Sequence, residues 1–253
     1  MTVIILSVWL AAGCKSPLPT FEEAPPADEL YGQGLEILEG RRLLRLIPWV
    51  NHAEAIETFQ AIIDNYPYSD YAVLAELKIA DAYFNDGKYE EALSYYRDFS
   101  DLHPQHPEVP YTIWRSALCH EKRKKTPNRD QTATRDAIVY LDRLLLKYPY
   151  SDYAAEGEEL WRSLRGQLAK NVVGIGDFYM KREEYESAAE RYRMLLNEYP
   201  GLGFDAATLY KLGVCYWEMN RKEEAGRIFQ SIVQNFESNE YAVKAEERIA
   251  SGD

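Results

Sequence analysis

A seven-residue segment occurs twice in this 253-residue chain and constrains the fold more than any other feature. The sequence YPYSDYA spans residues 66–72 and returns at residues 148–154, with weaker copies at 199–200 and 236–242. Each copy follows an amphipathic stretch with the periodicity of a helix. Such self-similarity indicates a solenoid, in which every unit buries its apolar face against the next unit.

Small and large side chains precede these copies at fixed spacing. Each amphipathic stretch ends at a proline, except the last, which ends at Glu237. An alanine stands twelve residues before each of these end positions, and a large side chain follows the alanine by four residues. The alanines are Ala55, Ala92, Ala137, Ala188 and Ala225, and the large residues are Phe59, Tyr96, Leu141, Tyr192 and Phe229. Ala80, Gly176 and Gly213 lie twelve residues before three of the alanines. Small residues let helices approach closely, large ones fill the space, and proline ends a helix.

This pattern resembles the tetratricopeptide repeat, a helix–turn–helix unit of 34 residues. We therefore predict an all-α superhelical solenoid of about five helix pairs and a C-terminal capping helix, without strands. The predicted pairs are 28–45 with 53–66, 71–86 with 89–102, 108–124 with 132–148, 153–182 with 185–199, and 203–219 with 222–236, and the cap is 240–251. Ser69 and Ser151 are predicted helix caps.

Two irregularities interrupt the repeats. The first repeat has a nine-residue insertion around residues 41–49, and residues 125–130 lengthen the loop of the third. Inserted loops in solenoids often lie on a binding face, although loop length is also thermodynamically cheap. Both interpretations stay open from the sequence alone.

The amino terminus resembles the signal of a bacterial lipoprotein. Residues 3–12 form an apolar run that is too short to span a bilayer, which needs about 20 residues. The following Gly13-Cys14 completes a segment that resembles a lipobox, whose cysteine is acylated after the signal is removed. The resemblance, with Lys15 next, implies anchoring at the outer membrane. The alternative is a secretory signal with an incidental cysteine.

These features predict the domain organisation. We expect a signal peptide at residues 1–13, an extended proline-rich tether at 14–27, and a repeat domain at 28–253 with halves 28–150 and 151–253.

Composition excludes several classes of function. The net charge of −12 and the absence of a long basic stripe exclude nucleic-acid binding. No catalytic motif or metal-ligand cluster is present, so we expect no enzyme, cofactor or metal site. Cys119 and Cys215 fall in apolar helical stretches and are expected to be buried free thiols. The basic run at 122–125 is most simply a solvated helix end.

The sequence favours a binding groove over a catalytic site as the functional region. In such a superhelix the first helix of each pair lines the concave face, which can hold extended peptides. By repeat position the groove candidates are Leu77, Asp81 and Phe84 in the second repeat and Val173, Asp177 and Met180 in the fourth. Each could equally be ordinary surface.

Several local segments resemble one family of lipoproteins. They are Pro25-Pro26 before Glu29-Leu30-Tyr31, residues 99–107 with Tyr111, residues 129–132, and residues 176–182. From about Pro25 to Ala242 the chain resembles the YfiO/ComL family, lipoproteins of the outer-membrane β-barrel assembly machine. Five repeats behind a lipidated cysteine are also similar to that family.

The resemblance implies a location and partners. It implies an outer-membrane lipoprotein on the periplasmic side, whose C-terminal half meets the POTRA region of a BamA-like barrel subunit. The N-terminal half would receive unfolded outer-membrane proteins, and accessory lipoproteins vary between lineages. The family arginine at the barrel-subunit interface falls on Arg182, whose planar fork can pair with a carboxylate. Otherwise, Arg182 is a helix C-terminal cation. The alternative function is an adaptor for another envelope assembly, pilotin-like or cell-wall-associated.

Overall fold

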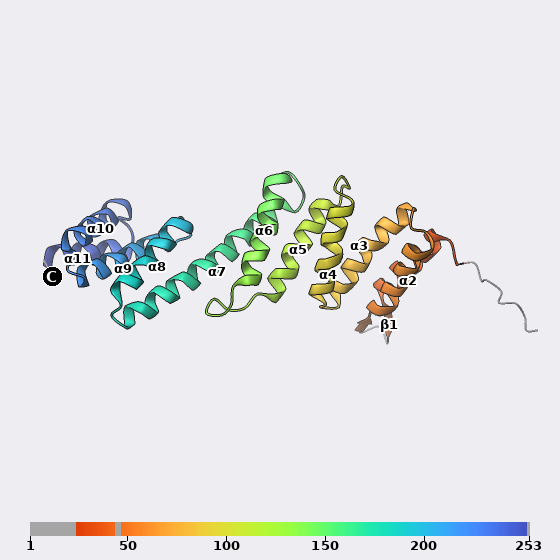
Figure 1. Ribbon diagram of the computed structural model, residues 1–253, viewed down its shortest axis with the longest axis horizontal. Helices are drawn as coiled ribbons and strands as arrows, with labels where there is room; N and C mark the ends of the chain where they lie inside the picture. The colour runs from red at the N-terminus through yellow and green to blue at the C-terminus, as the bar shows by residue number, and fades with distance from the viewer. Residues whose placement is uncertain (1–23, 44–46, 252–253) are drawn as a thin grey trace, which may run out of the picture.

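The protein is an elongated row of α-helices that pack side by side. The computed structural model describes residues 24–43 and 47–251, and Cys14 lies outside them. Figure 1 shows the helices alternating in direction along the long axis, with the first and last helices at opposite ends. The described helices are α1 Ala27–Glu39, α2 His52–Asn65, α3 Asp70–Asn85, α4 Tyr89–Leu102, α5 Val109–Arg123, α6 Thr132–Lys147, α7 Ala154–Lys181, α8 Tyr185–Glu198, α9 Asp205–Glu218, α10 Lys222–Asn235 and α11 Glu240–Ser251. The predicted solenoid of five pairs and a capping helix is confirmed.

Glycines let the two helices of a pair approach each other. A Cβ atom added to any of three glycines would lie 2.5–2.6 Å from an aromatic ring of the partner helix. The contacts join Gly34 to Phe59, Gly176 to Tyr192 and Gly213 to Phe229. Since real Cβ atoms do not approach rings so closely, these positions require glycine. The predicted small-and-large packing rule is therefore confirmed.

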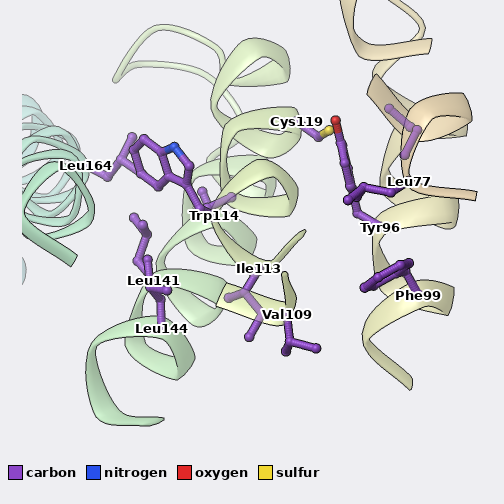
Figure 2. Packing of buried hydrophobic residues seen from close by; sticks show 14 residues of the cluster. Leu77, Tyr96, Phe99, Val109, Ile113, Trp114, Cys119, Leu141, Leu144 and Leu164 are labelled. Atoms are coloured by element: carbon purple, nitrogen blue, oxygen red, sulfur yellow. The ribbon is translucent and has the colours of Figure 1, made fainter. Parts of the chain in front are cut away.

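The long helix α7 belongs to two neighbouring parts of the core. Its Leu164 joins the cluster built by α3 to α6, and Figure 2 shows it beside the indole of Trp114 from α5. Further along α7, Ala169 and Val172 pack with Leu195 of α8. The two halves of the solenoid are thus joined through a single helix.

The insertion in the first repeat is a hairpin. Strands β1 Arg41–Leu43 and β2 Ile47–Trp49 pair antiparallel. The predictions of a first helix reaching residue 45 and of no strands were wrong. Gly40 ends α1 with φ of 78°, a left-handed conformation that favours glycine, and Pro48 cannot continue a helix.

Of the two predicted serine caps, one is confirmed. The Ser69 hydroxyl accepts the Ala72 N–H at 3.1 Å. Helix α7 instead begins at Ala154, three residues after Ser151, so the Ser151 hydroxyl is buried without a hydrogen-bond partner among the described residues. The prediction for Ser151 was therefore wrong.

Both cysteines in the described part of the chain are buried free thiols, as predicted. Burial raises the pKa of the Cys119 and Cys215 thiols to about 12. None of the described helices combines the length and apolar character needed to cross a membrane.

Candidate protein-binding surface

Two polar clusters on the solenoid are built alike. In the first, the Tyr96 hydroxyl of α4 donates to Asp81 Oδ1 of α3 at 2.7 Å. Arg115 Nε of α5 donates to the same Tyr96 oxygen at 3.0 Å. An acid, a tyrosine and a cation from three successive helices therefore meet at one point.

The second cluster repeats this arrangement further along the chain. The Tyr192 hydroxyl of α8 donates to Asp177 Oδ1 of α7 at 2.6 Å. Lys211 Nζ of α9 donates to both Asp177 oxygens, at 2.7 and 2.9 Å. In both clusters the tyrosine follows the acid by 15 residues and the cation follows the acid by 34. This second spacing equals the tetratricopeptide period, so the cation comes from the equivalent helix of the next repeat.

The first cluster is the more enclosed and the more highly bonded. The Tyr111 hydroxyl also donates to Asp81 Oδ1, at 2.6 Å, and the Arg115 guanidinium lies 3.8 Å from the centre of the Phe84 ring. Burial, reinforced by the nearby Asp81 charge, holds the pKa of Tyr96 and Tyr111 well above the usual range. Burial and the hydrogen bond to Asp177 do the same for the pKa of Tyr192. All three tyrosines therefore stay neutral donors at any physiological pH.

An exposed arginine follows the long helix. Arg182 ends α7, its side chain is 60% exposed, and its Nε donates to Glu184 Oε1 at 2.8 Å. The guanidinium also lies 5.5 Å from the ring centre of Phe178, which is 56% exposed. An arginine beside an exposed aromatic is the composition that binding hot spots favour.

A hollow of about 720 Å³ lies where α6 meets α7. Its lining is mainly apolar and comprises Asp142, Leu145, Leu146, Pro149, Ala154, Ala155, Glu158 and Trp161. The Trp161 indole donates to Asp142 Oδ1 at 2.7 Å, which fixes one wall of the hollow. Among the described residues, no group of three or more His, Cys, Asp or Glu side chains could hold a metal ion.

Comparison with known proteins decides the family. The family model YfiO, described as an outer membrane lipoprotein, matches residues 29–225. The chain belongs to the YfiO family. This match covers the five helix pairs except the first two residues of α1 and most of α10, and it includes both acid–tyrosine–cation clusters and Arg182.

Relatives of this YfiO-family chain occur in several bacteria. It is 27% identical over 250 residues to a protein of Caulobacter vibrioides named outer membrane protein assembly factor BamD, covering 96% of this chain and 79% of the relative. A protein of the same name from Neisseria gonorrhoeae is 25% identical over 205 residues, covering 77% of each chain. Among solved structures, the TPR2AB domain of yeast Sti1 in complex with pHSP90 is 16% identical with a TM-score of 0.44, covering 89% of this chain and 82% of that one.

The groove candidates of the second repeat lie deeper than predicted. Leu77 is 5% exposed and belongs to the core, so it offers no surface to a ligand, and its assignment to a groove is corrected. The Asp81 side chain is 14% exposed and binds its own neighbours, while Phe84 lies half-buried beneath Arg115. Positional rules did not include the hydrogen bonds that Tyr96 and Tyr111 donate to Asp81.

The candidates of the fourth repeat keep more contact with solvent. Asp177 is 37% exposed, whereas Val173 and Met180 are half-buried against neighbouring clusters. Arg115 and Lys211 were missed by the sequence reasoning. The 34-residue spacing from Asp81 and Asp177 was the signal that could have identified them.

Proposed function

We propose that this chain is a lipoprotein subunit of the outer-membrane β-barrel assembly machine, which scaffolds the barrel subunit and receives unfolded barrel substrates. The family match over residues 29–225 carries the proposal. The name outer membrane protein assembly factor, borne by the relatives in Caulobacter and Neisseria, supports it. On this proposal the chain works by binding alone and without catalysis.

The elongated shape suits a scaffold. A row of helix pairs exposes a large surface for its mass, and each repeat can offer different side chains to a different partner. The two polar clusters also tie successive repeats together, which limits the bending of that surface when a partner docks.

Anchoring through an acylated Cys14 is part of the proposal. The Tyr66 hydroxyl donates to the carbonyls of Ala24 and Pro25 at 2.9 and 3.0 Å, which fixes the start of the described chain on the first repeat. The ten residues from Cys14 to Ala24 can span at most about 35 Å when fully extended. A lipid on Cys14 would therefore hold the N-terminal half close to the periplasmic face of the outer membrane.

We assign the docking of a POTRA-containing barrel subunit to Arg182. Its present partner Glu184 is two residues away, and both side chains are exposed. Exposed ion pairs contribute only about 0.2–1 kcal/mol, so a partner carboxylate can replace Glu184 at little cost. Phe178 beside Arg182 would add apolar contact area to the same interface.

Substrate reception is assigned to the concave faces of α3 and α7. Asp177 with Lys211, and Phe84 with Arg115, offer alternating polar and aromatic contacts of the kind that hold an extended segment. Val173 and Met180 would supply the apolar part of the surface beside Asp177.

Crosslinked purification from native membranes tests the proposal. A C-terminally tagged chain should recover a POTRA-containing barrel protein as its largest partner, and Arg182→Glu should reduce that recovery. Lys181→Glu is the matched control because it makes the same charge change at the adjacent exposed position. Cys14→Ala should move the protein from membranes into the soluble periplasmic fraction. Recovery of a secretin or a cell-wall enzyme instead would overturn the proposed function.

A further inference from the structure

The loop between α5 and α6 carries a dense positive charge on an otherwise acidic protein. Residues 121–130 hold five cations and two acids, Glu121 and Asp130, whereas the whole chain has a net charge of −12. We propose that this surface, called the basic loop and formed by Lys122 in the last turn of α5 with Lys124, Lys125 and Arg129 of the loop after it, is a docking site for an acidic segment of a partner protein. This site is separate from Arg182 and goes beyond the proposed function.

The positive charge exceeds what the helix end needs. Cations in the last turn of a helix compensate its dipole, and Lys122 and Arg123 fulfil that role at the end of α5. Lys125 and Arg129 lie beyond the last helical residue, are exposed, and form no ion pair with any described residue. Their charge is therefore directed to solvent.

The loop is held in place by the side chain at the N-cap of α6 and by two side chains of α7. Gln131 Nε2 donates to the carbonyls of Thr126 and Arg129 at 2.8 and 3.0 Å. From α7, Gln167 Nε2 donates to the Lys125 carbonyl at 2.9 Å and Asn171 Nδ2 to the Pro127 carbonyl at 2.6 Å. Because these backbone carbonyls are already bonded, the loop would lose little conformational freedom on binding.

The surface is hollowed rather than flat. A concavity of about 410 Å³ is lined by Glu121, Lys122, Lys124, Lys125, Thr126, Pro127 and Gln167. The only carboxylate in that lining, Glu121, is shared between Lys124 and Lys122. The lining thus keeps two positive charges in excess, which suits side-chain carboxylates of an extended segment.

A protein segment fits this surface better than a lipid bilayer. None of the large exposed apolar side chains in the described part of the chain lies within residues 121–131, so the loop has no group to insert among lipid tails. At physiological ionic strength, charges are screened over about 8 Å, so the distant acids of the protein do not cancel the local field. Figure 1 shows this loop on the same long edge of the molecule as the turn after α7.

The affinity of the protein for an acidic peptide tests the proposal directly. The probe is a fluorescent peptide of eight glutamates, compared by anisotropy with one of eight glutamines. The loop variant K122Q/K124Q/K125Q should bind the glutamate peptide at least about ten-fold more weakly than the full-length wild type. The matched variant K147Q/K222Q/K244Q removes three positive charges elsewhere and should stay within about two-fold of wild type.

Controls separate the possible outcomes. Affinity for the glutamate peptide should fall with added salt, and Arg182→Glu should leave it unchanged within about two-fold. Equal losses in the two triple variants, or equal binding of the glutamine peptide, would overturn the proposal. So would loop-dependent sedimentation with phosphatidylglycerol vesicles when the glutamate peptide does not bind, since that would make the loop a membrane contact.

Discussion

Asp81 accepts hydrogen bonds from two tyrosine hydroxyls, so its removal should destabilise the fold far more than removal of an exposed acid. Tyr96 is fully buried, and its hydroxyl has no other acceptor recorded among the described residues. Asp81→Ala would leave the Tyr96 and Tyr111 hydroxyls without their acceptor and Arg115 without its counter-charge. Each buried donor left unpaired costs about 1–3 kcal/mol. Since Tyr111 can regain some bonding to water, we expect a total loss of about 2–4 kcal/mol.

The matched control is Asp86→Ala, at the end of the same helix. Asp86 is exposed and, among the described residues, its recorded ion pair is with exposed Lys88 at 2.9 Å, so its removal should change stability by less than about 0.5 kcal/mol. Tyr96→Phe, alone and combined with Asp81→Ala, completes a double-mutant cycle. We expect a coupling free energy of about 1–2 kcal/mol, because each single change already removes their shared hydrogen bond.

Urea unfolding followed by helical circular dichroism is the assay, with hydrogen exchange of α3 to α5 as a local readout. Repeat proteins can unfold in stages, so the exchange data identify which repeats lose protection. The reasoning would be refuted if Asp81→Ala cost no more than Asp86→Ala. A coupling free energy below about 0.5 kcal/mol would refute the direct link between Asp81 and Tyr96.

Two further predictions concern the core. Gly213→Val should lower the melting temperature markedly because even its Cβ would meet the Phe229 ring at 2.5 Å, whereas Gly226→Ala, which meets nothing within 4 Å, should be neutral or stabilising. The raised pKa of Cys119, about 12, keeps its thiol protonated in the fold while the unfolded thiol ionises from about pH 9. The unfolded state then binds fewer protons, so this thiol should lower stability as pH rises from 9 to 12, and Cys119→Ala should reduce that slope in pH-dependent urea titrations.

Local features of the sequence predicted most of the fold. Proline and the repeated YPYSDYA segment set the ends of helices to within a few residues, because their effect is confined to a few neighbouring bonds. The hairpin after α1 was missed since Arg41-Arg42-Leu43 has the composition of a helix, and the deciding residue is Gly40 with its positive φ. The turn at Gly40 is seen from its backbone φ angle and not from the composition of the residues that follow it.

Side-chain burial was the harder part to predict. Leu77 occupies the position of a groove residue, yet it is 5% exposed and lies beside Tyr96 of α4 in the core cluster that also contains Cys119 of α5 (Figure 2). Whether a position stays open therefore depends on side chains of neighbouring helices, which a local sequence pattern does not include. The pairing of Asp81 with Arg115 is missed for the same reason.

The junctions between repeats use different chemistry, and this bears on where the solenoid can bend. Polar clusters tie repeat two to three and repeat four to five. The junction between repeats three and four lacks such a cluster in the described structure; it combines the apolar packing of Leu164 with hydrogen bonds from the amides of Gln167 and Asn171 to the basic loop. On the proposed function, substrate contacts lie on both sides of this junction, at α3 and α7, whereas the docking residue Arg182 lies on the C-terminal side. An acidic segment that binds the loop would therefore act at one of the contacts between the two halves, so docking and substrate reception would be coupled through α7.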